Sequence, residues 1–167
     1  MKRELQLSEN LEDYLETIYE LEQTSKVARA KDIAEKLGVQ RASVTGALKS
    51  LEEKGLINYE PYSYITVTGR GRKIAKKITR RHAIIKDFLV NILQVDPEVA
   101  NETACRMEHA VTEDAVNRLV SFVDFIEKCP RTNTDWLSLF NQGCATGRLN
   151  PDKCAQCLEK FTKMQPE

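Results

Sequence analysis

The feature that most constrains the fold is a run of short predicted elements in the first half of the chain. Residues 30–37 have the apolar spacing of a short helix that ends at Gly38, and a second helix is predicted to end at Lys54. Two extended segments follow, at 56–60 and 64–68, and they predict a β-hairpin. Two helices joined by a tight turn and followed by a hairpin are typical of a winged helix-turn-helix.

The remaining pattern is helical. The periodicity predicts a helix over 8–24 with Ser8 as its N-cap, and a long helix that Thr68 caps and that runs toward Leu93. Two more helices are expected at 97–109 and 112–128. We therefore predict a mainly α protein in which a winged helix-turn-helix precedes an α-helical domain. The expected boundaries are 1–74, 75–128 and a C-terminal extension at 129–167.

One face of the predicted second helix is suited to a DNA groove. Its apolar positions are expected to pack on the helix before it: Ile33, Ala34 and Leu37 against Val44, Leu48 and Leu51. The opposite face carries short or basic side chains, which can lie deep in a major groove and contact phosphates. The predicted DNA-binding residues, wing tip included, are Arg29, Arg41, Ala42, Ser43, Thr45, Lys49, Tyr62 and Ser63.

The charge of the chain is unevenly distributed. The net charge is zero overall, but residues 26–86 hold 15 Lys and Arg against 5 Asp and Glu. A run of charge usually means only a solvated surface. Here the basic segment coincides with the predicted winged module, so we expect double-stranded DNA as the partner.

Length and composition exclude several classes of protein. A chain of 167 residues can bury one moderate core or two small ones, which leaves no room for a large enzyme. The pattern holds no evident nucleophile–base pair and no phosphate-binding glycine loop, so we do not expect catalysis. The N-terminal residues do not resemble a signal peptide, and no apolar run is long enough to span a membrane. We expect a cytoplasmic protein.

Three helical segments carry candidate metal ligands. Cys105, Glu108 and His109 have the i, i+3, i+4 spacing that places them on one helix face. Asp13 and Glu16 have a similar spacing, and His82 is the other histidine of the chain. Mixed oxygen, nitrogen and sulfur donors suit Fe²⁺ or Mn²⁺ better than a closed zinc site. Spacing alone leaves open that these are ordinary surface residues.

Four motifs in order resemble the diphtheria toxin repressor and manganese transport regulator family, in its short two-domain form. They are LEDYLETIYELE at 11–22, VTGRG at 67–71, Arg81-His82, and ACRMEH at 104–109. The resemblance covers about residues 8–128. It implies a homodimeric repressor that controls metal homeostasis, needs Fe²⁺ or Mn²⁺, and binds a pseudo-palindromic DNA operator. It also implies that residues 75–128 form an α-helical dimerisation and metal-binding domain.

Carried over by position, the resemblance assigns the metal ligands and also shows a hybrid. The implied ligands are Asp13, Glu16, His82, Cys105, Glu108 and His109. Iron-responsive members typically have methionine in place of Asp13, and manganese regulators a carboxylate in place of Cys105. An ancillary site of the iron members would need an acid at Lys86 and a histidine at Asn101. Both are absent, so we expect His82 to join a mononuclear or binuclear cluster.

The C-terminal extension is rich in thiols. Cys129, Cys144, Cys154 and Cys157 lie beyond the resemblance, and the last two form a Cys-x-x-Cys pair. Such a pair is a recurrent ligand spacing, so we expect a second site for Zn²⁺ or an iron–sulfur cluster. Unligated thiols are the simpler alternative. An alternative function follows from the same residues, namely a winged-helix transcription regulator that senses redox state through thiols or an iron–sulfur cluster.

Overall fold

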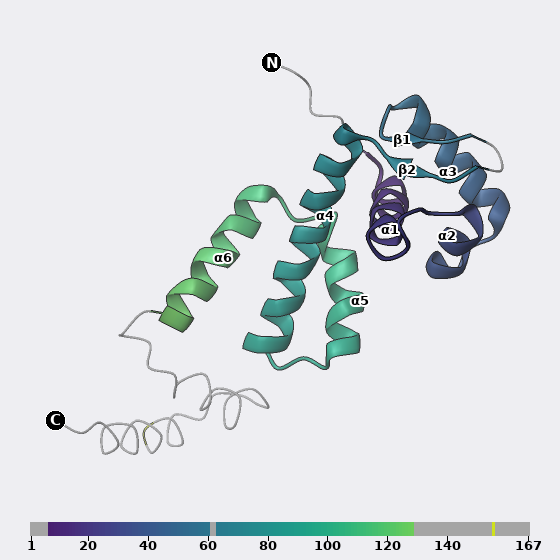
Figure 1. Ribbon diagram of the computed structural model, residues 1–167. Coiled ribbons are helices and arrows are strands. Elements are labelled where there is room, and N and C mark those ends of the chain that lie inside the picture. The colour runs from purple at the N-terminus through teal and green to yellow at the C-terminus, as the bar shows by residue number, and fades with distance from the viewer. Residues whose placement is uncertain (1–6, 61–62, 129–154, 156–167) are drawn as a thin grey trace. The chain divides into compact units, whose positions relative to one another are not determined.

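The computed structural model describes residues 7–60, 63–128 and 155. In these residues the chain is mainly helical, as predicted (Figure 1). The helices are α1 (Glu9–Ser25), α2 (Ala30–Leu37), α3 (Arg41–Glu53), α4 (Gly69–Asp87), α5 (Pro97–Glu108) and α6 (Glu113–Lys128). Their bounds lie within a few residues of the predicted ones, except at the end of α4.

The chain divides into two compact units. The first comprises residues 1–83 and 105–111, and the second comprises residues 84–104 and 112–167. The first unit thus contains α1, α2, α3, the hairpin, most of α4 and the last turn of α5. It holds the winged module and every candidate ligand of the metal cluster.

The wing is a two-stranded antiparallel sheet. Strands β1 (Ile57–Asn58) and β2 (Thr66–Val67) pair with Ile57 opposite Val67. They are shorter than the predicted segments because the flanking residues bond elsewhere. The Leu56 N–H donates to the Leu51 carbonyl at the end of α3, and Ile65 forms a β-bridge with Ala28. That bridge fixes the wing to the segment between α1 and α2.

One apolar core holds α1, α2, α3 and the wing together. Leu15, Ile18, Ile33, Val44 and Leu48 are each 0% exposed. The predicted packing of α2 on α3 is therefore confirmed, although the Leu37 position is only partly buried. Burial of each such side chain stabilises the folded chain by about 1.5–3 kcal/mol. Because α1 contacts α2, α3 and β2, its position is coupled to that of the DNA-reading helix.

The start of α4 is fixed tightly to the end of α3. Thr68 caps α4, as predicted, because its Oγ1 accepts a hydrogen bond of 3.1 Å from the Gly71 N–H. The same hydroxyl donates to the Gly55 carbonyl at 2.9 Å. A β-carbon added to Gly71 would lie 2.0 Å from the Leu56 carbonyl oxygen, so this close approach requires glycine. At α1, by contrast, Ser8 occupies the N-cap position without a capping side-chain hydrogen bond.

The helix that was predicted to run toward Leu93 ends earlier as an α-helix. The α-helix ends at Asp87, and the chain continues as a π-helical turn, η1 (Phe88–Ile92), because the Leu93 N–H donates to the Phe88 carbonyl five residues earlier. On α6, Val116 and Ile126 are buried, whereas Phe122 is 49% exposed. Among the described residues, no helix combines the length and the apolar character that crossing a bilayer requires.

Candidate metal centre

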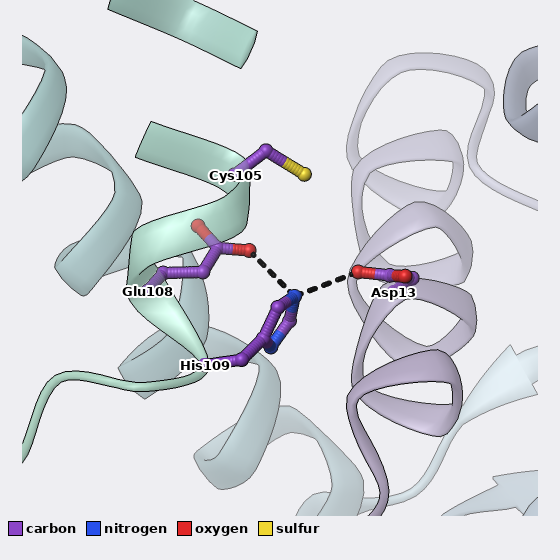
Figure 2. Close-up of side chains that lie close together, drawn as sticks. All are labelled: Asp13, Cys105, Glu108 and His109. Carbon is purple, nitrogen blue, oxygen red and sulfur yellow. Dashed lines mark hydrogen bonds and ion pairs between the residues drawn. The ribbon is translucent and has the colours of Figure 1, made fainter. Parts of the chain in front are cut away.

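Four candidate ligands meet between α1 and the C-terminal end of α5. Asp13 lies on α1, Cys105 and Glu108 lie on α5, and His109 follows α5 directly. Figure 2 shows their side chains converging from the two helices. Each offers one donor atom, and these donor atoms all lie within 4.8 Å of one another. The described residues thus include a thiol, an imidazole and two carboxylates within reach of one cation.

The core of the winged module positions the α1 part of this cluster. Tyr14, Leu15 and Ile18 are buried and fix the rotation of α1 about its own axis. Asp13 and Glu16 stand three residues apart, so they share the neighbouring polar face. The packing of the DNA-reading module therefore sets the direction of both carboxylates.

Glu108 is the most unusual residue of the cluster. Its side chain is 0% exposed, and Oε2 lies 2.8 Å from His82 Nδ1. The other oxygen, Oε1, is buried without a hydrogen-bond partner, and its nearest ion-pair contact is His109 Nε2 at 3.5 Å. A buried carboxylate oxygen without a donor is costly unless a cation accompanies it. This orphaned oxygen points toward the other donors and fits a bound metal ion.

The His109 ring lies between carboxylates on both sides. Nε2 is 2.8 Å from Asp13 Oδ1, and Nδ1 is 2.9 Å from Glu12 Oε2. Burial lowers the pKa of His109, but the hydrogen bond with Glu12 and the charges of Asp13 and Glu108 outweigh it, so the pKa is raised. The surroundings of this ring therefore favour positive charge.

The acids of the cluster are destabilised as anions when no cation is present. Burial and the charge of Glu108 raise the pKa of Glu16 to about 7. The pKa of Asp13 is also raised, because burial outweighs the attraction of His109. Burial and the charge of Glu108 raise the pKa of the Cys105 thiol to about 11. A divalent transition-metal ion, which binds carboxylate, imidazole and thiolate donors, would relieve this repulsion.

The structure brings four of the six predicted ligands into one group: Asp13, Cys105, Glu108 and His109. Glu16 and His82 lie outside this group of four but beside it. His82 bonds Glu108 directly, and the charges of Glu108 and His82 both act on Glu16. Both residues therefore interact with the carboxylate of Glu108. Their assignment as metal ligands stays a prediction.

Two neighbours of the cluster were not predicted as site residues. Glu12 contacts His109, and the Arg81 Nη2 donates to the same Glu12 oxygen, Oε2, at 3.1 Å. Glu12 stands directly before a predicted ligand in the chain, and Arg81 stands directly before His82. Only the tertiary structure shows that Glu12 contacts His109 and that Arg81 contacts Glu12, so the sequence could not predict these pairs.

Lys86 and Asn101 occupy the positions at which iron-type members have ancillary ligands, and here the two side chains are hydrogen-bonded to each other. Lys86 Nζ donates to Asn101 Oδ1 at 2.9 Å; Lys86 is half-buried and Asn101 is exposed. An ammonium group has no lone pair for a cation and repels it. These two residues therefore do not form a second metal site of that kind.

The predicted DNA-binding face of α3 is accessible. Arg41, Ala42, Ser43, Thr45 and Lys49 are all exposed, while Val44 between them is buried in the core. Arg29 is exposed too, and its Nη2 donates to the Tyr64 hydroxyl on the wing at 3.3 Å. Ser63 is exposed at the wing, whereas Tyr62 lies outside the described residues. The accessible residues have the exposure that contact with DNA requires.

The predicted second metal or cluster site cannot be placed. Cys129, Cys144, Cys154 and Cys157 all lie outside the described residues. The expected zinc or iron–sulfur site in the extension therefore stays a prediction.

Comparisons with known proteins agree with this arrangement. Residues 6–65 match the family model described as the iron dependent repressor, N-terminal DNA binding domain. Residues 68–137 match the model of the iron dependent repressor, metal binding and dimerisation domain. The two matches cover both the winged module and the α5 part of the metal cluster.

Individual relatives are similar over most of the chain. An HTH-type transcriptional regulator of Methanocaldococcus jannaschii is 39% identical over 119 residues, which are 71% of this chain and 95% of that protein. The HTH-type transcriptional regulator MntR of Listeria monocytogenes is 34% identical over 121 residues, 72% of this chain and 84% of that one. The solved structure of the manganese regulator SloR is similar with a TM-score of 0.63 at 32% identity. That alignment covers 71% of this chain but only 55% of the SloR chain. These matches favour a metal-dependent regulator over the thiol-based redox alternative.

Proposed function

The chain belongs to the iron dependent repressor family of metal-dependent transcriptional repressors, and from this premise we propose that it binds Mn²⁺ or Fe²⁺ through Asp13, Cys105, Glu108 and His109. Glu16 and His82 are proposed to complete this site. The observation that carries the proposal is the buried Glu108 Oε1, which lacks a hydrogen-bond partner and faces the other three donors. Metal binding is proposed to activate the protein for DNA binding.

The link from the site to DNA passes through α1. Asp13 stands on a helix whose Leu15 and Ile18 are buried in the same core as Leu48 of α3. The ion supplies the positive charge that the buried carboxylates lack, together with coordinate bonds from both helices. Without the ion, His109 offsets only part of the repulsion between Asp13 and Glu108, and the remaining repulsion favours other arrangements of α1 and the end of α5. An ion that tightens DNA binding a hundredfold must bind the competent state about 2.7 kcal/mol better.

The ligand set supports both candidate metals. Cys105 offers a soft sulfur donor, which suits Fe²⁺, whereas Asp13 offers a hard oxygen donor, which suits Mn²⁺. SloR is described as a manganese regulator, and the matching family models are those of iron dependent repressors. We therefore keep both metals as candidates for this chain.

The proposed target is a pseudo-palindromic operator. The family match includes a dimerisation domain, which indicates that the chain works as a homodimer on DNA. Two copies of α3 related by a twofold axis would contact two half-sites, about one helical turn of DNA or a multiple of it apart. The exposed face of α3 would read the major groove, with Arg29 and the wing near the phosphates.

A titration of DNA binding with metal tests the proposal. In the absence of oxygen, Mn²⁺ and Fe²⁺ are expected to tighten operator binding by the wild-type dimer. The substitution His109→Ala should abolish this stimulation while the protein remains a folded dimer. The matched control is Glu98→Ala, an exposed acid at the start of α5, which should behave as wild type. Unchanged metal dependence in His109→Ala would remove the proposed ligand role.

A further inference from the structure

A single oxygen of Glu12 binds two partners from different elements. Glu12 Oε2 lies 2.9 Å from His109 Nδ1 and 3.1 Å from Arg81 Nη2. The three side chains are 19%, 7% and 17% exposed, so water competes little for these contacts. We propose that Glu12 is a positioning residue that fixes the orientation and the proton position of the His109 ring in the metal-bound protein. This inference rests on the proposed function.

The contact with Glu12 determines which nitrogen of the His109 imidazole carries the proton. A histidine that ligates a metal is neutral, with a lone pair on the ligating nitrogen and a proton on the other. An ionised carboxylate only accepts hydrogen bonds, so the Nδ1 beside Glu12 must carry the proton. The Nε2 lone pair then faces the space shared with Asp13 Oδ1, at 2.8 Å, and Glu108 Oε1, at 3.5 Å. The opposite tautomer would place a lone pair against Glu12.

Glu12 acts through His109 and is not itself a ligand. Its Oε2 already takes the Nδ1 and Arg81 contacts, and it meets the ring on the nitrogen that faces away from the cluster. The group of four donor atoms within reach of one ion does not include it among the described residues. Carboxylate–histidine–metal triads of this kind orient the ring and raise its basicity.

Arg81 and Asp13 complete a clamp around the ring. Arg81 on α4 restrains Glu12, and Glu12 and Asp13 are consecutive residues of α1 that contact opposite nitrogens of His109. The ring after α5 is thus held by α1 through two adjacent side chains, with α4 as a support. Removal of Glu12 would leave a ring that can turn away from the cluster.

Metal affinity gives the first test. Glu12→Ala removes the acceptor and is expected to weaken Mn²⁺ binding about 10- to 100-fold, the usual effect of losing a partner of a ligating histidine. Glu12→Gln keeps an oxygen that can accept the Nδ1 proton, but a neutral amide is a weaker acceptor than a carboxylate, so the affinity should fall measurably, by up to about tenfold. The control is Glu9→Gln, which removes an exposed carboxylate from the same helix and should not change the affinity.

Nitrogen-15 NMR of the Cd²⁺-loaded protein provides the second test, because Cd²⁺ is diamagnetic. The chain has two histidines, so the His82→Gln variant assigns the signals of His109. In wild type we expect cadmium-113 coupling to Nε2 of His109 and a slowly exchanging proton on Nδ1. Glu12→Gln should retain both signals, and Glu12→Ala should lose the slowly exchanging proton. Wild-type affinity together with an unchanged Nδ1 proton in folded Glu12→Ala would overturn the inference.

The other possible results of these two tests also support or overturn the role proposed for Glu12. If Glu12→Ala does not fold, Glu12→Gln is decisive: a measurable loss of affinity with the Nδ1 proton retained supports the role, whereas wild-type affinity overturns it. Cadmium coupling through Nδ1 in wild type would overturn it as well. If wild type binds no metal at the cluster at all, the proposed function fails, and this result is distinct from metal binding that is insensitive to Glu12.

Discussion

The apolar core of the winged module and the metal cluster lie in the same compact unit, yet they differ in how far the chain alone completes them. In the core, Leu15, Ile33 and Leu48 are 0% exposed and packed by other apolar side chains. In the cluster, Glu108 is 0% exposed too, but one of its oxygens has no hydrogen-bond partner. The core is completed by its own residues, whereas the proposed metal site leaves one buried carboxylate oxygen without a partner from the described residues.

This difference teaches that burial serves two purposes in one small unit. Burial of apolar groups stabilises the fold, and substitutions there should destabilise it. Burial of carboxylates lowers the stability of the metal-free fold and raises the affinity for a cation. Substitutions in the two regions should therefore affect stability with opposite signs, and the following variants test that contrast.

The largest effect is expected from Glu108→Gln. The variant keeps the size of the side chain and an oxygen for His82 but removes the buried charge. We expect Mn²⁺ affinity to fall about 1000-fold, or roughly 4 kcal/mol. The metal-free variant should unfold with a free energy no lower than that of wild type. Isothermal titration calorimetry and urea unfolding measure the two quantities, and a metal-free variant that is clearly less stable would break the contrast.

Gly71→Ala should give the largest loss of stability on the core side. An added β-carbon would lie 2.0 Å from the Leu56 carbonyl oxygen and 2.9 Å from Val67 Cγ1. Relief of such a clash requires backbone shifts, and we expect a loss of about 3 kcal/mol in the free energy of unfolding. Gly69→Ala is the matched control, because nothing lies within 4 Å of its added β-carbon. Equal stability of the two variants in urea would contradict the close approach of α4 to Leu56.

Glu22→Ala should have a smaller effect on the same side. Glu22 Oε1 accepts a hydrogen bond from the Val67 N–H at 3.3 Å, and Oε2 pairs with Arg72 at 2.7 Å. Its side chain is 11% exposed, and we expect its loss to cost about 2 kcal/mol of stability. The control is Glu20→Ala, whose pair with Lys36 is exposed and should contribute less than about 0.5 kcal/mol. Thermal unfolding that ranks the two variants in the reverse order would remove the role assigned to Glu22.

The smallest effect concerns neither region but the DNA-binding face. Lys49→Ala removes an exposed charge from α3 and should weaken operator binding by about 1 kcal/mol or less. The slope of log affinity against log salt should fall by about one, because one phosphate contact is lost. Metal affinity should not change. Fluorescence anisotropy at several salt concentrations measures the slope, with Lys128→Ala on α6 as the control, and an unaltered slope would exclude Lys49 as a phosphate contact.

Much of the fold was predictable because it depends on local pattern. Apolar spacing predicted α2 and α3, and Gly38 predicted the end of α2, where it adopts a φ of 65°. The sequence could not predict the π-helical turn at Phe88–Ile92, since its buried residues Leu89 and Ile92 stand three apart, as they would on an α-helix. The hairpin was predicted, but not the shortness of its strands, because Ile65 pairs with the distant Ala28.

The metal cluster was predictable where its residues share a helix. The i, i+3, i+4 spacing placed Cys105, Glu108 and His109 on one face of the predicted helix, and the family resemblance supplied Asp13. The role of Glu12 could not be read in this way, because its partner His109 is 97 residues away along the chain. Contacts of this kind depend on how α1 meets residues 105–111 in the folded unit, and no local pattern encodes them.

The contrast between the two regions rests on one claim, that the buried carboxylate of Glu108 needs a cation. Urea unfolding of wild type and Glu108→Gln, each with and without Mn²⁺, tests it most directly. At free Mn²⁺ a hundredfold above the wild-type dissociation constant, wild type should gain about 2.7 kcal/mol of stability and the variant almost none. An equal gain in both proteins would contradict the claim, because the ion would then bind elsewhere.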